Sequence, residues 1–311
     1  MDSSPADVDP SPADQDNLVI VVLQFGKVAS TSIVSAFNAL DGVTAHQSHY
    51  LGRDAYRRVL DNIMDPILSD YFFRHQIGQL TQNIAISRSI ERITHGHVPG
   101  RVALVSLARN HLDWARSALI QDVVGYLELF EILAARDDPE AVLGPRGKVR
   151  AGIEAMLQRI IDLIEKCGGA EPFLDRLRTK QLADFAETDF WDLPAGPTFF
   201  FTFLRPLLWF ETEFPASTGL RLHDLEPHAG FWKATKDSRD HYVLRYEDIP
   251  SSLESIARDL GLQEMPQLPE QNVSAPKPFA DDIRDTLSGD RARRIHALFA
   301  RTDYQSFFGY A

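Results

Sequence analysis

The chain has 311 residues, of which 44% are hydrophobic, so it is long enough to bury a large core. Its formal net charge of −12 argues against a general nucleic-acid or membrane-surface binder, because such proteins carry an excess of lysine and arginine. The single cysteine, Cys167, excludes an intramolecular disulfide and a metal site built from cysteines. The sequence shows no signal-peptide pattern and no run of about 18 apolar residues, so we expect a soluble, cytoplasmic protein without a membrane span.

The expected elements alternate between strands and helices. Residues 1–16 are rich in Pro, Ser and Asp and are expected to form a disordered acidic tail before a single domain over residues 17–311. Apolar runs predict strands, which begin at Leu18, at Gly42 in GVTAH, at Arg101 in RVALVSLAR and at His241 in HYVLRYEDI. Helical spacing predicts helices within 53–95, 112–134, 150–187 and 252–260, with helical insertions at about 53–95 and 135–190. This order favours the α/β class, with a mostly parallel central sheet and helices on both faces.

A turn that contains a lysine follows the first expected strand. In LVIVVLQFGKVASTSIVSAFNAL (residues 18–40), the apolar run ends at Gly26-Lys27 and a helical pattern follows. Glycine permits a sharp turn, and the unpaired amides at a helix start attract an anion. The nucleotide signature GxxxxGK[ST] is absent, because Val21 and Val28 stand where it needs glycine and a hydroxyl residue. The pattern indicates a phosphate-binding turn, with an ordinary Ser/Thr-capped turn as the alternative. Hydroxyl donors would come from Ser30, Thr31 and Ser32.

A second candidate for anion binding follows a later strand. The run VALVSLAR ends in Arg109, and Ser117 lies two turns along the next expected helix. Ligands of parallel sheets sit outside the carboxyl ends of the strands, so Arg109 is expected at the same edge as the Lys27 turn. An arginine fork with a hydroxyl suits a phosphate monoester. The alternative for a lone arginine after a strand is a surface ion pair.

With these motifs the chain resembles the sulfotransferases that use 3′-phosphoadenosine 5′-phosphosulfate (PAPS). QFGKVASTSI is similar to the loop that holds the 5′-phosphosulfate in carbohydrate sulfotransferases, and Arg109 with Ser117 resembles the pair that holds the 3′-phosphate. Five further stretches resemble the putative capsular polysaccharide synthesis family, a sulfotransferase-like group: SLARNHLDWARSALIQD, PLLWFETEF, VLRYEDI, NVSAPKPFADDIR and DYQSFFGY. The chain departs from that family at Asn110-His111, where the family tends to have an acidic residue and proline, and over 53–95.

The resemblance implies a P-loop-type three-layer sandwich and transfer of a sulfuryl group to a hydroxyl, in particular one of a carbohydrate or polysaccharide. PAPS would be the co-substrate, and neither a metal nor a nucleic-acid partner is expected. Lys277 matches the region that closes over the nucleotide, with a solvated surface lysine as the alternative. The residues implied at the 5′-phosphosulfate are Gly26, Lys27, Ala29, Ser30, Thr31 and Ser32.

The resemblance also implies a His or Glu base near the end of the second strand, where the sequence reads AHQSHYL. Histidine suits this role because it titrates near neutral pH. His49 is preferred because it falls just beyond the strand, and His46 is second. His97 in ITHGHVPG is a rival, although it is expected on the loop that enters the Arg109 strand, at the opposite edge of the sheet. A P-loop kinase or NTPase and a non-catalytic, sulfotransferase-like binding protein remain as alternative functions.

Two other segments are expected to be structural. Glu247 and Asp248 in RYEDI are expected to cap the following helix, with Arg245 paired to one of them. The aromatic residues of PLLWFETEF have helical spacing and are expected in the core rather than in a sugar platform. They are Trp209, Phe210 and Phe214.

Overall fold

The computed structural model describes residues 17–65, 69–140, 142–179, 192–269 and 277–310, with only the backbone described over 69–77. The expected disordered tail, residues 1–16, lies outside these described residues, as does the end of the second expected insertion.

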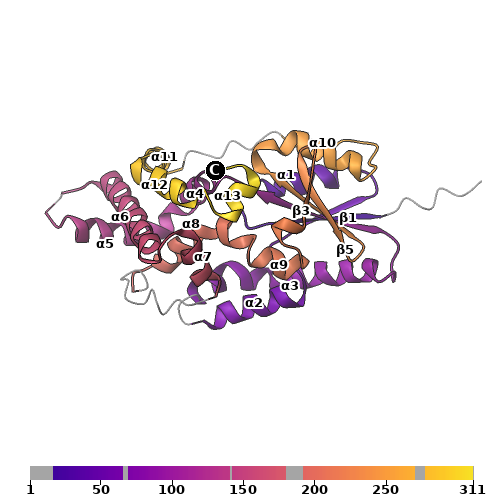
Figure 1. Ribbon diagram of the computed structural model, residues 1–311, viewed down its shortest axis with the longest axis horizontal. Coiled ribbons are helices and arrows are strands. Elements are labelled where there is room, and N and C mark those ends of the chain that lie inside the picture. The colour runs from indigo at the N-terminus through magenta and orange to yellow at the C-terminus, as the bar shows by residue number, and fades with distance from the viewer. Residues whose placement is uncertain (1–16, 66–68, 141, 180–191, 270–276, 311) are drawn as a thin grey trace, which may run out of the picture.

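A six-stranded sheet forms the centre of the fold, in the order β2-β1-β3-β6-β5-β4 (Figure 1). The four parallel strands are β1 (Leu18–Leu23), β2 (Val43–Ser48), β3 (Arg101–Ala108) and β6 (Arg239–Arg245). All six residues of β1 are buried, as both faces of this strand are covered. The predicted α/β class with a mostly parallel central sheet flanked by helices is confirmed.

Two antiparallel strands extend the sheet beyond β6, and the sequence did not predict them. They are β5 (Phe231–Lys236) and β4 (Glu226–His228). The three residues of β4 are exposed and include Pro227, so no apolar run or alternation marks this strand. Proline is tolerated there because β4 is the edge of the sheet.

Helices cover both faces of the sheet (Figure 1). On one face, α1 (Ser30–Asn38) packs on β1 and β2, and α10 (Ile249–Asp259) packs on β5 and β6. On the other face, α3 (Ser69–Thr94) packs on β2 and β3, and α2 (Gly52–Met64) packs on α3. The helical segment expected at 53–95 is therefore made of α2 and α3.

The remaining helices gather mainly at one end of the molecule, around α6 (Figure 1). There α6 (Pro145–Lys166) packs against α5 (Leu127–Asp137), α7 (Ala170–Arg178), α11 (Ala280–Thr286) and α12 (Asp290–Phe299). The helices that complete the described chain are α4 (His111–Asp122), α8 (Gly196–Trp209), α9 (Glu213–Thr218) and α13 (Asp303–Phe308), with short 3-10 turns at Val123–Tyr126, Leu222–Asp224 and Tyr246–Asp248.

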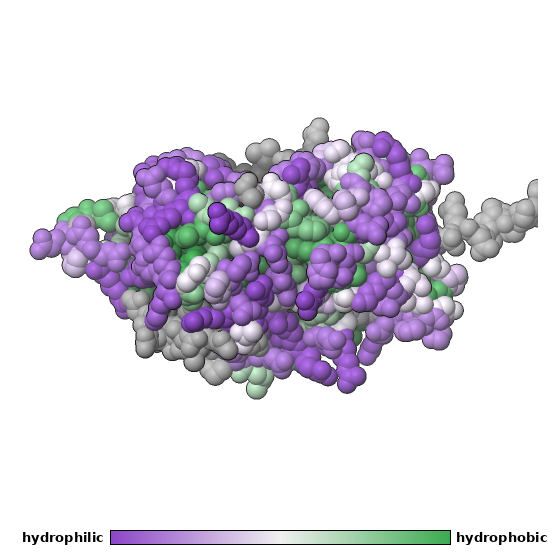
Figure 2. Space-filling view, viewed as in Figure 1, coloured by the Kyte–Doolittle hydropathy of each residue, from purple (hydrophilic) through white to green (hydrophobic). Residues whose placement is uncertain are grey.

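One continuous core joins the sheet to this helical end. The prediction that Trp209, Phe210 and Phe214 are core residues is confirmed, because each is at most 1% exposed. Figure 2 shows a mostly hydrophilic face with smaller hydrophobic areas. None of the helices in the described part of the chain combines the length and the apolar character needed to cross a bilayer.

Candidate functional site

The loop between β1 and α1 is a strained turn at the carboxyl edge of the sheet. Gly26, Lys27 and Ala29 have φ angles of 96°, 56° and 59°, a region that residues other than glycine rarely adopt. The amide of Gly26 donates to the side-chain oxygen of Gln24, and α1 begins at Ser30 without a side-chain cap. The Ser/Thr-capped turn considered from the sequence is therefore wrong.

A cavity of about 220 Å³ opens beside this loop. Lys27 and His49 both line it, so the predicted phosphate cation and the preferred base share one space. Residues of three helices complete the wall: Gln79 of α3, Trp114, Ala118, Gln121 and Asp122 of α4, and Thr202 and Arg205 of α8, together with Phe25 and Gly26 of the loop.

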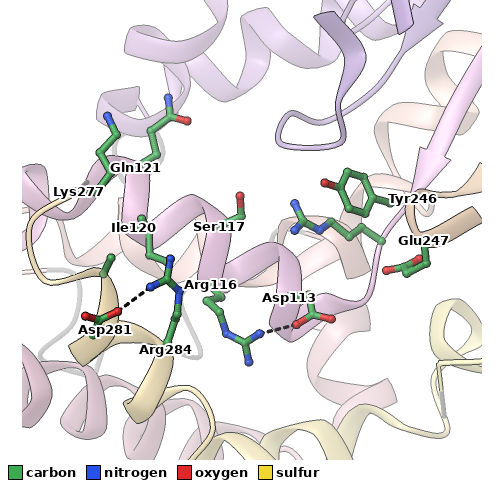
Figure 3. Close-up of a pocket in the computed structure, with 12 residues that line it drawn as sticks. Asp113, Arg116, Ser117, Ile120, Gln121, Tyr246, Glu247, Lys277, Asp281 and Arg284 are labelled. Carbon is green, nitrogen blue, oxygen red and sulfur yellow. Dashed lines mark hydrogen bonds and ion pairs between the residues drawn. The ribbon is translucent and has the colours of Figure 1, made fainter. Parts of the chain in front are cut away.

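A second cavity, of about 550 Å³, lies beside the first, and Gln121 lines both. Arg109, Ser117 and Lys277 line this larger cavity, so the three residues predicted around the rest of the nucleotide lie together. Figure 3 shows Ser117 and Gln121 along α4, with Tyr246 to one side and Lys277 to the other. The two cavities therefore adjoin at Gln121 of α4.

The side chain of Arg109 is fixed by two contacts. Its Nη1 donates to the backbone oxygen of Lys27 at 2.6 Å, and its guanidinium carbon lies 4.1 Å from the centre of the Tyr246 ring. Its Nε is buried and has no hydrogen-bond partner among the described residues. Arg109 therefore connects the larger cavity to the loop that carries Lys27.

Helix α4 carries residues of both cavities and starts in a defined way. Asn110 caps it by accepting from the amides of Leu112 and Asp113 at 3.0 and 3.3 Å. His111 is fully buried and lies 2.8 Å, through Nε2, from the carbonyl of Phe203. Asn110 therefore caps the helix and His111 anchors its first turn. One turn further on, the indole Nε1 of Trp114 donates to the carbonyl of Gly26 at 2.7 Å.

The charges of the larger cavity are only partly neutralised by the protein itself. Arg116 pairs with Asp113 and Arg284 pairs with Asp281, each at 2.7 Å, as Figure 3 shows. Among the described residues, neither Arg109 nor Lys277 takes part in an ion pair. These two cations are therefore available to an anionic ligand.

Burial lowers the pKa of Lys27, and the nearby Lys277 lowers it further, while Asp122 acts in the opposite direction. An anion beside Lys27 would stabilise the ammonium form and raise this pKa again. A phosphate or sulfate bound there would therefore stabilise the charged form of Lys27.

His49 lies directly beyond β2 and points back to the loop. Its Nδ1 is 2.8 Å from the carbonyl oxygen of Gln24, which can only accept, so Nδ1 carries a proton. In the neutral ring Nε2 is then the nitrogen without a proton, which is the form that a general base needs.

The two rival histidines lie outside both cavities. His46 is within β2, in register with Val21, and burial lowers its pKa. His97 is exposed in the turn between α3 and β3, next to the start of the strand, as the sequence predicted. Of the three candidates, His49 alone lines a cavity with Lys27.

Unlike the other residues predicted to bind the nucleotide, those that follow Lys27 do not line a described cavity. Ala29, Ser30, Thr31 and Ser32 line neither cavity, since the chain enters α1 there, with Ser30 buried and Thr31 exposed. Sequence reasoning missed Trp114, Gln121, Arg205 and Tyr246. The spacing of Trp114 three residues before Ser117 was a usable signal, because such residues share a helix face.

The expectation for the segment after β6 is half correct. Arg245 pairs with Asp248 at 2.6 Å, as predicted. Neither acidic residue caps α10, however: Asp248 makes no side-chain cap bond, and Glu247 accepts from the amide of Asn110 at 3.2 Å and from the hydroxyl of Tyr310 at 2.7 Å. Glu247 supports the loop after β3 instead.

Comparison of the chain with models of known families, with curated proteins and with solved structures finds no match.

Proposed function

We propose that this protein is a PAPS-dependent sulfotransferase with a P-loop-type three-layer fold, which transfers a sulfuryl group to a hydroxyl of a carbohydrate. The observation that carries the proposal is the pair of adjoining cavities at the carboxyl edge of the sheet. One contains Lys27 and His49, and the other contains Arg109, Ser117 and Lys277. A nucleotide with phosphate groups at both its 5′ and 3′ positions matches two separate cationic sites.

In the proposed complex, Lys27 contacts the 5′-phosphosulfate, and Arg109 with Ser117 binds the 3′-phosphate. The guanidinium offers a fork of donors and the hydroxyl adds one more, which suits the oxygens of a phosphate monoester. Lys277 adds a positive charge to the wall of the larger cavity. Tyr246, which already stacks on Arg109, keeps the fork in place.

The reaction follows from the positions of Lys27 and His49. The acceptor hydroxyl oxygen forms a bond to sulfur, the bond between sulfur and the bridging phosphate oxygen breaks, and the hydroxyl proton passes to Nε2 of His49. Negative charge develops on the leaving phosphate, where the ammonium of Lys27 stabilises it. Burial of Lys27 strengthens this interaction, because charges attract each other more in a site with little water.

A saccharide acceptor is supported by the polar wall of the smaller cavity. Gln79, Thr202 and Arg205 offer hydrogen-bonding groups in the same space as His49. The resemblance to the capsular polysaccharide synthesis family favours the same class of acceptor.

A P-loop kinase remains a second candidate because Asp122 lines the cavity of Lys27. A carboxylate at that place is the group that a kinase would use toward magnesium and a triphosphate.

The test is transfer of radiolabelled sulfate from PAPS to a panel of neutral and acidic polysaccharides, with phosphate transfer from ATP and magnesium measured in parallel. We expect sulfate transfer in the wild type and its loss in His49→Ala. Phosphate transfer without sulfate transfer would assign the protein to the kinases.

A further inference from the structure

The backbone of Arg109 lies just beyond the hydrogen-bond ladder of the sheet. The last register pair between β3 and β6 joins Ala108 to Arg245, and the pairing of β3 with β1 ends earlier, at Val105. Among the described residues, the N–H and C=O of Arg109 therefore have no backbone partner on a neighbouring strand. Arg109 is half-buried, and a backbone group shielded from water without a partner costs about 1–3 kcal/mol, so a partner from another part of the chain stabilises this position.

Tyr304 of α13 fills this place, 195 residues further along the chain. Its hydroxyl accepts from the amide of Arg109 at 2.9 Å and donates to the carbonyl oxygen of the same residue at 2.7 Å. One hydroxyl thus replaces both bonds that a neighbouring strand would supply. The tyrosine is 2% exposed, and its burial raises its pKa, so it stays a donor at ordinary pH.

A second contact from the end of the chain holds the next residue. Tyr310 donates its hydroxyl to Glu247 at 2.7 Å, and the other carboxylate oxygen of Glu247 accepts from the amide of Asn110 at 3.2 Å. The rings of Tyr304 and Tyr310 lie 6.0 Å apart, centre to centre. Residues 304–310 therefore hold the main chain of both Arg109 and Asn110.

We infer that Tyr304 is a positioning residue for the 3′-phosphate site, which sets the main chain from which the Arg109 side chain reaches the larger cavity. Tyr310 supports it through Glu247. The inference rests on the proposed function, because Arg109 is the residue assigned to the 3′-phosphate. Residues 304–310 line neither cavity, yet through Arg109 they would determine the affinity for the 3′-phosphate.

The experiment compares two affinities, for adenosine 3′,5′-bisphosphate and for adenosine 5′-monophosphate, in wild type and in Tyr304→Phe. The phenylalanine ring keeps the packing on Phe210 and Phe308, with ring centres now at 5.6 and 5.2 Å, and removes only the hydroxyl. We expect the affinity for the bisphosphate to fall about tenfold more than the affinity for the monophosphate, because the monophosphate is affected only through the hydrogen bond between Arg109 and the Lys27 loop. A merely structural role would not change the ratio of the two affinities in a folded protein.

Tyr242→Phe is the matched control, because it also removes a buried hydroxyl, one that donates to Asp259 at 2.6 Å outside both cavities. The ratio of its affinities for the bisphosphate and the monophosphate should equal that of the wild type. Tyr310→Phe provides a second test in case Tyr304→Phe does not fold, and its ratio should fall about threefold. A wild-type ratio in the folded Tyr304→Phe, or in Tyr310→Phe if only that variant folds, would overturn the inference and leave the proposed function intact. A wild-type protein that binds both nucleotides equally would instead overturn the proposed function, and this inference with it.

Discussion

Arg109 donates a hydrogen bond of 2.6 Å to the main-chain oxygen of Lys27, so the two predicted phosphate cations are joined directly. The bond crosses from the end of β3 to the loop after β1. A ligand bound to Arg109 therefore acts, through this bond, on the loop that carries Lys27.

This link predicts different effects for the two residues of the proposed 3′-phosphate site. Arg109→Lys keeps the charge but loses the fork, so affinity for adenosine 3′,5′-bisphosphate should fall at least about tenfold. Affinity for the 5′-monophosphate should fall as well, because the Lys27 loop loses its tie. Ser117→Ala, in contrast, should weaken only the bisphosphate. Calorimetric titration with both nucleotides measures these affinities. If Arg109→Lys, like Ser117→Ala, weakens only the bisphosphate, then the hydrogen bond between Arg109 and Lys27 has no effect on the loop.

Lys27→Ala should fold normally, because this half-buried loop residue contributes little to the core. Turnover should fall by about 10²-fold or more, as when one donor to a developing charge is removed. Lys148→Ala, at a half-buried lysine that pairs with Glu131 and lines neither cavity, is the control. Unchanged turnover in a folded Lys27→Ala would remove this lysine from the mechanism.

The lowered pKa of Lys27 also predicts a pH dependence in the free protein. Its ammonium is lost at a pH below the ordinary lysine value of 10.5, so nucleotide affinity should decline as the pH rises toward that value. Lys27→Arg stays protonated throughout and should lack this decline. Nucleotide affinity measured between about pH 7 and 10 tests this prediction. The same decline with pH in the wild type and in Lys27→Arg would contradict it.

His49→Ala should reduce turnover by about 10²–10⁴-fold while nucleotide affinity stays close to that of the wild type. The rate of the wild type should rise with pH on its acidic side, because only the neutral imidazole accepts a proton. His46→Ala and His97→Ala are the controls, since these residues line neither cavity. A collapse of activity in one of these controls, with full activity in His49→Ala, would transfer the role of base.

Two buried histidines predict how stability depends on pH. Burial lowers the pKa of His111 and of His241 to about 4, against an ordinary value of 6.5. The unfolded chain therefore binds protons at these sites before the folded chain does, so stability falls as the pH drops from about 6.5 to about 4 and changes no further below that. Each group accounts for at most about 3 kcal/mol.

His241→Leu isolates one of these contributions. Both ring nitrogens of His241 are buried without a hydrogen-bond partner among the described residues, and its charged neighbours are Lys236, Asp237, Arg239 and Asp240. The variant should be at least as stable as the wild type at pH 7 and should lose less stability on acidification. Thermal unfolding at pH 7 and pH 4.5 measures the stability of both proteins. An equal loss of stability between these pH values in His241→Leu and in the wild type would show that His241 does not cause it.

The sequence predicted the parts of the fold that rest on strong apolar runs. The four parallel strands were expected within a few residues of their bounds, and the placement of Lys27, His49 and Arg109 at one edge followed from the parallel order. The sequence did not predict β4 or β5. The strand β4 is short and exposed and contains Pro227, so no apolar pattern marks it. Nor did the sequence indicate Tyr304 or Arg205, which approach the site from distant segments through tertiary packing alone.

The Ser30–Ser32 stretch shows the same limit within the predicted motif. Its residue types suit a phosphate turn, yet its side chains line neither cavity, because the main chain has already entered α1. Residue type and spacing predicted a turn after β1 but could not show which of its side chains face the cavities.

The central claim is that the two cavities accommodate a nucleotide with phosphates at both its 5′ and 3′ positions. Calorimetric titration of the wild-type protein with adenosine 3′,5′-bisphosphate, adenosine 5′-monophosphate, and ATP with magnesium tests it most directly. The account predicts that the bisphosphate binds at least about tenfold more tightly than the monophosphate, because it gains charge-assisted bonds to Arg109 and Ser117. Equal affinities for these two nucleotides, or a preference for ATP with magnesium, would contradict it.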